Sequence, residues 1–329
     1  MTEAQADALL ARDPASLAGL IAKGDCRLQA GDERAAVSFY RAAIDAAAAA
    51  PALPPGFADE LARIEALLSR CGGNFRLHLE ACLAAEGLGP DQVGGRFAEA
   101  LAILFQEKEA RLELQQPSLF YFPGLPQREF YEPEAFDWTA PLVAATGQIR
   151  DELAALLASE AGFRPYVERE RDRPQHDFHG LLDDPRWSAF YLIEDGAVRE
   201  DHAALCPHTM AALEKVPLCT LPGRTPSVHF SLLRSGARIP PHRGMLNARL
   251  ICHLPLIVPD DCALRVGRDT RRVEAGRMLI FDDSIEHEAW NESGETRVIL
   301  LFDIWRPELD ETERRAVAAM FRAIDSYRS

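Results

Sequence analysis

The sequence lacks the features that mark secreted, membrane-spanning and disulfide-bonded proteins. Its seven cysteines are scattered, their number is odd and no CxxC pair occurs. This pattern argues against a disulfide framework or a zinc knuckle and favours a reducing compartment. Plainly apolar runs such as 100–105 and 298–302 are far too short to cross a bilayer, and the acidic amino terminus is unlike a secretory signal. We therefore predict a cytoplasmic protein without a membrane anchor.

Positive charge is also scarce. The chain has 36 Lys and Arg residues against 51 Asp and Glu residues, which gives a formal net charge of -15. Nucleic-acid binding needs clustered cationic side chains, so this balance argues against a nucleic-acid partner. The length of 329 residues exceeds what one small core would need and predicts two domains.

Residues 1–115 are rich in Ala and Leu and are predicted to be all-helical. Asp32 is a suitable N-cap for a helix over 33–50. Small residues at Gly24 and Gly31, followed by Tyr40, resemble the spacing of one tetratricopeptide repeat, although both aromatic positions of the repeat's first helix are unmatched. We interpret the region as a short helical-repeat module that could bind a protein partner, with a plain helical cap as the alternative. Further helices are predicted over 59–70, 74–87, 96–114, 142–161 and 308–328.

The hydrophobic pattern changes at Trp187. From there to Pro307 short apolar segments of strand length are separated by glycines and turns, over 187–193, 228–233, 250–257, 262–266, 278–281 and 297–302. Many short strands at regular spacing are typical of a sandwich or barrel, of which the jelly roll is one form. The predicted fold class is α+β, with a helical domain over 1–115 and a β domain over 116–329.

Two histidines and an arginine stand out in the β-rich half. His242 and His287 lie 45 positions apart, and Arg297 follows ten residues after the second histidine. Neutral imidazoles bind iron, zinc and copper, and residues this far apart can meet across a barrel. Either histidine alone would be interpreted as an ordinary core or surface residue. Together, in this setting, they predict a metal site beside a carboxylate-binding arginine.

The third ligand of the familiar non-haem iron site is not where it is expected. That carboxylate normally stands two residues after the first histidine, and here the position is Gly244. Asp282 and Asp283 precede His287 closely enough to supply a carboxylate. They fit better as a turn cap or as a hydrogen-bonding partner around the ligands.

The residues around these positions resemble the aspartyl/asparaginyl β-hydroxylase family. The matching motifs are His242-x-Gly244, Asn247-x-Arg249-Leu-x-x-His253-Leu, Gly276, Phe281-Asp-Asp-Ser-x-x-His287-Glu-x-Trp290-Asn, Arg297 and Asp303-x-Trp305-x-Pro307. The likeness covers about 130–307. Members of the family are iron(II)- and 2-oxoglutarate-dependent dioxygenases with a double-stranded β-helix fold. They bind iron through two histidines and keep a glycine in place of the carboxylate, so the resemblance implies that His242 and His287 bind Fe(II).

The resemblance also implies a binding site for the cosubstrate 2-oxoglutarate. Arg297 would pair with the distal carboxylate, because a guanidinium offers a planar fork to a carboxylate. Ser231 would donate to the same end, His253 would contact the chelating end and Trp187 would line the pocket, with ordinary core packing as the alternative for Trp187. Arg249 completes the set of expected cosubstrate-binding residues.

One departure concerns the arginine that some relatives carry two residues after the position of Arg249. Here that position is Ile251. The near carboxylate of the cosubstrate is therefore expected to be held differently from that in such relatives, unless Arg249 takes over the contact.

The activity implied by the resemblance is hydroxylation, with O2, of an aspartyl or asparaginyl β-carbon in a peptide, a protein or an amino-acid-derived substrate. Arg234, Arg238 and Arg243 are candidates for attracting a substrate carboxylate, and ordinary solvated charge is the alternative for all three. Two other functions stay open. One is a related dioxygenase that hydroxylates a lipid acyl chain, and the other is a non-catalytic helical-repeat and β-barrel binding protein.

Overall fold

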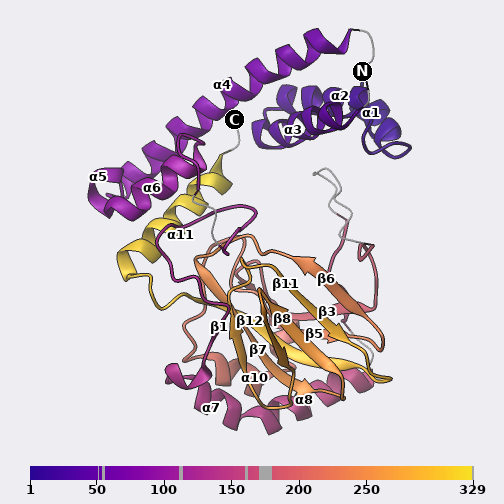
Figure 1. Ribbon diagram of the computed structural model, residues 1–329, viewed down its shortest axis with the longest axis vertical. Coiled ribbons are helices and arrows are strands. Elements are labelled where there is room, and N and C mark those ends of the chain that lie inside the picture. Colours follow the sequence, from indigo (N-terminus) through magenta and orange to yellow (C-terminus); the bar gives the residue numbers. More distant parts are fainter. Residues whose placement is uncertain (51, 54–55, 111–113, 160–161, 170–179, 328–329) are drawn as a thin grey trace. The chain divides into compact units, whose positions relative to one another are not determined.

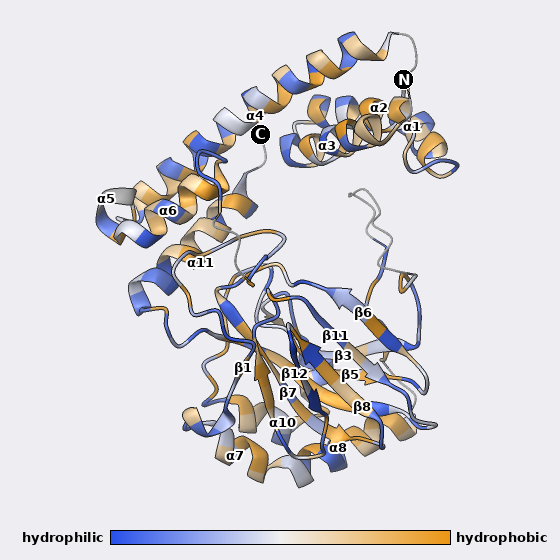
Figure 2. Ribbon diagram, viewed as in Figure 1, coloured by the Kyte–Doolittle hydropathy of each residue, from blue (hydrophilic) through white to orange (hydrophobic). Residues whose placement is uncertain are grey.

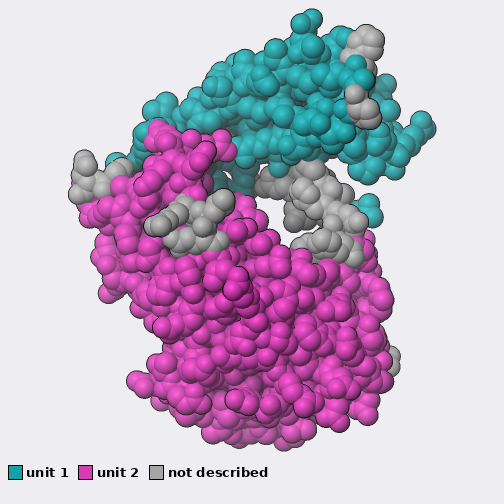
Figure 3. All heavy atoms as spheres, in the orientation of Figure 1, with its two compact units in different colours: residues 1–87, 169–177, 323–329 teal, residues 88–168, 178–322 magenta. Residues whose placement is uncertain are grey.

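The computed structural model describes residues 1–329 except 51, 54–55, 111–113, 160–161, 170–179 and 328–329 (Figure 1). The chain forms two compact units (Figure 3). The first consists chiefly of residues 1–87 with the end of the chain from residue 323, and the second of residues 88–168 and 178–322. The predicted domain boundary at residue 115 stays a prediction. None of the helices in the described part of the chain is long and apolar enough to cross a membrane.

The first unit is helical, as predicted. Its helices are α1 (Glu3–Leu10), α2 (Leu17–Gln29), α3 (Glu33–Ala49) and α4 (Phe57–Ala85). Asp32 caps α3, because its side chain accepts a hydrogen bond from the backbone N–H of Ala35. Gly24 on α2 faces the ring of Tyr40 on α3 so closely that a β-carbon at position 24 would overlap it. The absence of a side chain therefore sets how closely these two helices pack.

Two predicted helices are in fact one. Helices expected over 59–70 and 74–87 are both part of α4, which runs through Gly72 and Gly73 without a break. A glycine inside a helix costs about 1 kcal/mol relative to alanine, and the strong helix formers on both sides outweigh it. Two other boundaries also differ. The helix expected over 96–114 ends at Leu104, and the one expected over 142–161 is divided between Thr139–Ala144 and Thr146–Ser159, with its last two positions outside the described residues.

The second unit combines helices with two antiparallel sheets. Its remaining elements are α5 (Pro90–Val93), α6 (Gly95–Leu104), β1 (Phe130–Tyr131), η1 (Pro133–Ala135), α7 (Thr139–Ala144), α8 (Thr146–Ser159), β2 (Arg164–Pro165), β3 (Trp187–Glu194), β4 (Ala197–Val198), α9 (Glu200–Ala203), α10 (Pro207–Leu213), β5 (Val228–Leu233), β6 (Arg238–His242), β7 (Arg249–Ile257), β8 (Cys262–Val266), β9 (Asp269–Arg272), β10 (Leu279–Phe281), β11 (His287–Asn291) and β12 (Arg297–Trp305). Helix α11 (Glu311–Ser326) ends the described chain.

The strand order is that of a jelly roll. The larger sheet runs β1-β10-β7-β12-β5-β3-β2, with β4 beside β3, and the smaller runs β6-β11-β8-β9. From β5 to β12 the chain passes repeatedly between the two sheets, which produces the double-sheet arrangement. Figure 1 shows α7, α8 and α10 along one side of the strands. Apolar residues are frequent along the strands and polar residues along the loops that join them (Figure 2).

Each central strand of the larger sheet is buried on both faces. On β5, Phe230 and Leu232 point toward the apolar cluster under the helices, whereas Leu233 joins a second cluster between the two sheets. Because successive side chains of a strand point to opposite faces, His229 and Ser231 share the inner face with Leu233. This inner face, together with the smaller sheet opposite it, holds the predicted site residues.

Candidate active site

The two predicted metal ligands are direct neighbours. His242 ends β6 and His287 begins β11, the two residues are paired across the strands, and their ring centres lie 4.1 Å apart. The Nδ1 atoms of His242 and His287 lie 2.8 Å and 3.0 Å from the carbonyl oxygens of Pro240 and Ile285. A carbonyl oxygen only accepts, so each Nδ1 carries the proton and each neutral ring has its lone pair on Nε2. This tautomer is the one that metal-binding histidines need.

Burial keeps His287 uncharged. The pKa of His287 is lowered to about 3, first by burial and then by His242 beside it. Among the residues that the structure describes, no group of three or more His, Cys, Asp or Glu side chains is placed to hold a metal ion. Within the described residues, the candidate donor set is therefore the two imidazoles of His242 and His287.

Gly244 faces a carboxylate. A β-carbon at position 244 would overlap the carboxylate of Asp283, and the Gly244 N–H donates to the backbone carbonyl of Asp283 at 2.6 Å. Oδ2 of Asp283 is held at 3.1 Å by Nη2 of Arg249, whereas Oδ1 is buried without a partner in the described structure. The volume that a side chain at 244 would need is thus filled by the side chain of Asp283.

Asp282 has a different position. Its Oδ2 forms a buried ion pair with Nη1 of Arg306 at 2.6 Å, and its Oδ1 accepts from the N–H and the hydroxyl of Ser284. This carboxylate closes the turn before β11, as the turn-cap prediction required. Asp283 is consequently the carboxylate of this pair that lies against Gly244, two residues after His242.

Arg297 is buried, and its Nε and Nη1 atoms meet no anion among the described residues. The side chain is 1% exposed, and its Nε and Nη1 atoms have no partner among the described residues. Burial lowers the pKa of Arg297 to about 10. A buried cation is costly unless a charge of opposite sign pairs with it. Arg297 therefore has the surroundings of a group that awaits a carboxylate.

The strand register brings the other predicted residues to the same inner face. Arg297 lies opposite Leu233, Ser231 lies opposite Ile299, and His253 lies opposite Leu301, so all three site side chains share one side of the sheet. Nε1 of Trp187 donates to Oγ of Ser231 at 3.3 Å. The predicted cosubstrate residues Trp187, Ser231, His253 and Arg297 are thus brought together.

His253 connects the arginine to the histidine pair. Burial lowers the pKa of His253 well below its usual value, and the charges of Arg297 and His287 lower it further, so both lie close by. The ring of Phe281 packs 5.0 Å from His253 and 5.4 Å from His287. Nδ1 of His253 is a buried polar atom without a partner in the described structure. Arg297 and His253, each with buried polar atoms that have no partner among the described residues, accordingly lie on the inner side of the sheet.

Arg249 is already engaged. Its Nη1 binds Oδ2 of Asp303 at 2.8 Å, and its Nη2 binds Asp283. The neighbouring inward position on β7 is Ile251, which is 7% exposed and packs in the cluster between the sheets. The predicted contact of Arg249 with the cosubstrate stays a prediction.

Two of the three arginines considered as candidates for attracting a substrate carboxylate form ion pairs with glutamates. Nη2 of Arg238 lies 3.1 Å from Glu288, and Nη2 of Arg243 lies 3.4 Å from Glu286. Arg265 bridges the same two glutamates. These contacts agree with the alternative of ordinary surface charge.

Sequence reasoning missed three residues on the inner face. Tyr166 stacks on Trp187 with ring centres 4.1 Å apart, and the rings of Tyr166 and Tyr191 lie 5.4 Å and 4.8 Å from His229. His229 could have been found from the sequence, because it lies two residues before Ser231 on the same predicted strand and so points to the same face of the sheet. Tyr166 could not, because it follows a two-residue strand and is placed by tertiary contacts.

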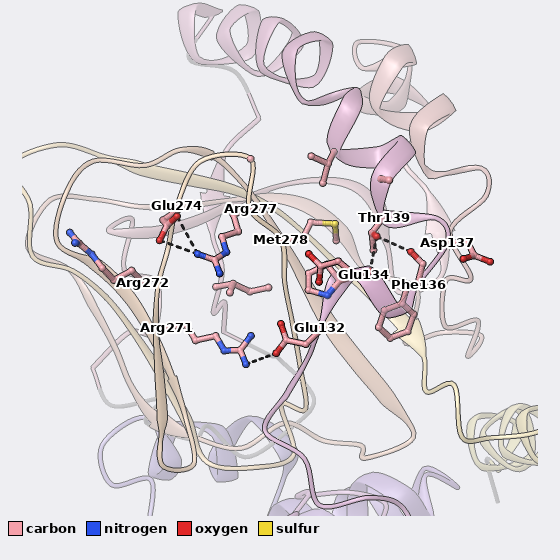
Figure 4. A pocket seen from close by; sticks show the side chains of 15 residues that line it. Glu132, Glu134, Phe136, Asp137, Thr139, Arg271, Arg272, Glu274, Arg277 and Met278 are labelled. Carbon is pink, nitrogen blue, oxygen red and sulfur yellow. Dashed lines mark hydrogen bonds and ion pairs between the residues drawn. The ribbon is translucent and has the colours of Figure 1, made fainter.

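A groove of the described structure lies elsewhere. It has a volume of about 1010 Å³ and is lined by the segment 132–143 and by residues 271–279 (Figure 4). Its charges pair with one another, Arg271 with Glu132 and Arg277 with Glu274. None of the predicted site residues lines it, so its volume does not identify the active site.

Comparisons with known proteins bear on the same region. Residues 144–307 match the family model described as aspartyl/asparaginyl beta-hydroxylase. The human aspartyl/asparaginyl beta-hydroxylase is 30% identical over 253 residues, which are 75% of this chain and 31% of that protein. The ornithine lipid ester-linked acyl 2-hydroxylase of Rhizobium tropici is 35% identical over 180 residues, 54% of this chain and 60% of that protein.

The chain thus spans about a third of the length of the human relative and three fifths of that of the bacterial one. Among solved structures, the cupin domain of Schizosaccharomyces pombe Cnp3 matches 28% of this chain and 64% of its own, with 14% identity and a TM-score of 0.24.

Proposed function

Because the chain belongs to the aspartyl/asparaginyl β-hydroxylase family, we propose that it is an iron(II)- and 2-oxoglutarate-dependent hydroxylase. The observation that carries the proposal is the neighbouring pair His242 and His287 together with the buried Arg297, whose Nε and Nη1 atoms have no partner among the described residues. A metal-binding protein that did not use a dicarboxylate would have no need of the second feature.

Each residue has one task in this proposal. His242 and His287 would hold Fe(II) through their Nε2 atoms, since their Nδ1 atoms face carbonyl oxygens. Arg297 and Ser231 would hold the distal carboxylate of 2-oxoglutarate from the inner face of the sheet. When bound, iron, 2-oxoglutarate and O2 supply the oxidation, in which one oxygen atom enters succinate as CO2 is lost and the other enters a C–H bond of the substrate. The protein orients these groups and excludes water.

The substrate that we propose first is an aspartyl or asparaginyl β-carbon in a peptide, a protein or a small amino-acid derivative. A lipid acyl chain is the second candidate, because the Rhizobium tropici relative, at 35% identity, is named for acting on one. We further propose that the helical region is tetratricopeptide-like and binds a protein partner. The packing of Gly24 against Tyr40 supports that proposal.

A cytoplasmic location is also part of the proposal. It is supported by the seven cysteines, each of which is a free thiol in the structure.

Anaerobic calorimetry tests the proposal. The full-length protein should bind Fe(II), and the loaded protein should bind 2-oxoglutarate. Arg297→Ala should weaken 2-oxoglutarate binding by about thirtyfold or more, because truncating one partner of a buried charge pair costs about 2–5 kcal/mol. His242→Ala should abolish metal binding. Arg238→Ala is the matched control, since it removes an exposed arginine that is paired with Glu288. Absence of 2-oxoglutarate binding by the metal-loaded protein would refute the proposal.

A further inference from the structure

We infer that the group held beside the histidine pair is an uncharged carboxamide rather than a carboxylate, and that His229 is the residue that selects it. The inference rests on the proposed function and names the substrate class of the same site. It follows from the position of His229, from its unpartnered nitrogen and from the pairing of the charges around it.

His229 lies within the candidate site. It is on β5, two residues from Ser231, and it is paired with Tyr191 on β3 and with Leu301 on β12. Leu301 in turn is paired with His253, so one row of inward side chains runs from Tyr191 through His229 to His253. His229 is also among the groups whose charge would act on His253.

One nitrogen of His229 is available for a ligand. The side chain is fully buried, its Nδ1 lies 3.2 Å from Oγ of Ser227, and its Nε2 has no partner among the described residues. Buried polar atoms are normally hydrogen-bonded, so an orphaned Nε2 in a substrate site points to a ligand atom. Burial also lowers the pKa of His229 to about 3, so the ring supplies a hydrogen bond without a positive charge.

The cations of the inner face are committed to other groups. Arg249 binds both Asp283 and Asp303, so this cluster contains one cation and two carboxyl groups. Arg297 faces the place proposed for the cosubstrate. Within the described part of the chain, the inner face therefore offers no further cation for a substrate carboxylate, and the inward position at 251 is an isoleucine.

A carboxamide satisfies these surroundings and a carboxylate does not. A buried carboxylate here would lack a counter-ion and would lie near Asp283, and burying an unpaired charge is unfavourable. A carboxamide has a carbonyl and an amino group. These can form hydrogen bonds with Nε2 of His229 and with the hydroxyl of Tyr166. The charges of Arg249, Asp283 and Asp303 act on the pKa of that hydroxyl. An apolar side chain would fit by size but would leave both hydrogen-bonding groups unpaired.

The test uses three blocked peptides that are identical except for one residue, which is Asn, Asp or Leu. The three side chains are similar in size and differ in charge and hydrogen bonding. Binding to the full-length protein is measured by calorimetry under anaerobic conditions with Fe(II) and 2-oxoglutarate, and peptide-dependent succinate formation is measured in air. We expect the Asn peptide to bind about tenfold or more tightly than either of the others.

Two variants separate the role of His229 from general damage. His229→Lys adds a cation, and it should shift the Asn-to-Asp binding ratio toward Asp by about tenfold or more. His229→Gln keeps an uncharged hydrogen-bonding group and should retain the preference for Asn. 2-Oxoglutarate affinity, measured for all three proteins, reports whether the cosubstrate end is intact.

Each other outcome overturns the inference. If the Asp peptide binds as tightly as the Asn peptide or more tightly, the site does not discriminate against a charged side chain. If the Leu peptide does so, hydrogen bonds to the side chain do not contribute to selection. Absence of binding of all three peptides, or an unchanged ratio in His229→Lys with normal 2-oxoglutarate affinity, also overturns it. Failure of the proposed function looks different. The protein would then not bind 2-oxoglutarate, and the preference among the peptides would be measured on the metal-loaded protein by calorimetry alone.

Discussion

At the scale of single residues, the absence of a side chain at Gly244 leaves room for the carboxylate of Asp283. Gly244 is positioned so that the carboxylate of Asp283 occupies the volume that its own side chain would need. Asp283 is held there by Arg249, and Arg249 is held by Asp303, so the glycine depends on a chain of charges from β7 and β12. A carboxylate introduced at 244 would therefore meet one that is already present.

The first prediction concerns this overlap. Gly244→Asp should destabilise the protein by about 2–4 kcal/mol, because it adds atoms to an occupied volume and places a second carboxylate beside Asp283. Urea unfolding of the variant and the wild type measures the difference. The double variant Gly244→Asp/Asp283→Gly removes the competing carboxylate and should recover most of the loss. A single variant as stable as the wild type would contradict the overlap.

A second prediction concerns pH and also belongs to the residue scale. Burial lowers the pKa of His229 to about 3 in the folded protein, against about 6.5 when unfolded. Below pH 6.5 the unfolded chain binds a proton that the folded protein excludes, so this contribution to stability is lost as the pH falls from 6.5 toward 3. Over that window the wild type should lose up to about 1.4 kcal/mol per pH unit more than His229→Gln. Parallel stability curves, from urea unfolding between pH 7 and pH 4, would show that His229 is not buried as described.

At the scale of elements, glycines that look alike in the sequence behave differently in the helices. Gly24 on α2 faces the buried ring of Tyr40, whereas nothing lies within 4 Å of the place that a β-carbon of Gly72 on α4 would occupy. The first glycine allows two helices to approach, and the second only weakens the helix that contains it.

The third prediction compares these two positions. Gly24→Ala should destabilise the first unit by about 1–3 kcal/mol, because the added methyl group overlaps Tyr40. Gly72→Ala should stabilise it by about 1 kcal/mol through helix propensity alone. Thermal unfolding followed by circular dichroism measures both changes. If the two alanines have the same effect, the close packing of α2 on α3 is wrong.

At the scale of the whole molecule, the ligands should stabilise one unit. The histidine pair, Arg297, Ser231 and His253 all belong to the second unit, and a ligand that binds only the folded state stabilises it by mass action. None of the residues predicted to bind iron or 2-oxoglutarate belongs to the first unit.

The fourth prediction is therefore a selective shift in thermal stability. Anaerobic addition of Fe(II) and 2-oxoglutarate should stabilise the second unit. The stabilisation by 2-oxoglutarate should be about 2.7 kcal/mol when its free concentration is about a hundredfold above its Kd for the iron-loaded protein. Calorimetric scans should show the shift in the wild type and in Gly72→Ala, a variant of the first unit. They should not show it in His287→Ala. A shift of equal size in His287→Ala would place the metal elsewhere.

Local chemistry explains what the sequence determined by itself. The cap at Asp32 follows from residues close together. The β-rich run from Trp187, and the choice of His242, His287 and Arg297 as candidate site residues, follow from recognisable patterns. These features depend on interactions within a few residues, or on motifs that can be matched position by position.

Only the tertiary structure decided which groups are committed and which are available. It shows that Asp282 closes a turn while Asp283 fills the space beside Gly244, and that Arg249 is engaged by two carboxylates. It also shows that His229, on the inner face, has a nitrogen without a partner among the described residues. The physical reason is that strand register and side-chain pairing between residues far apart in the sequence determine burial and charge, and no local pattern specifies them.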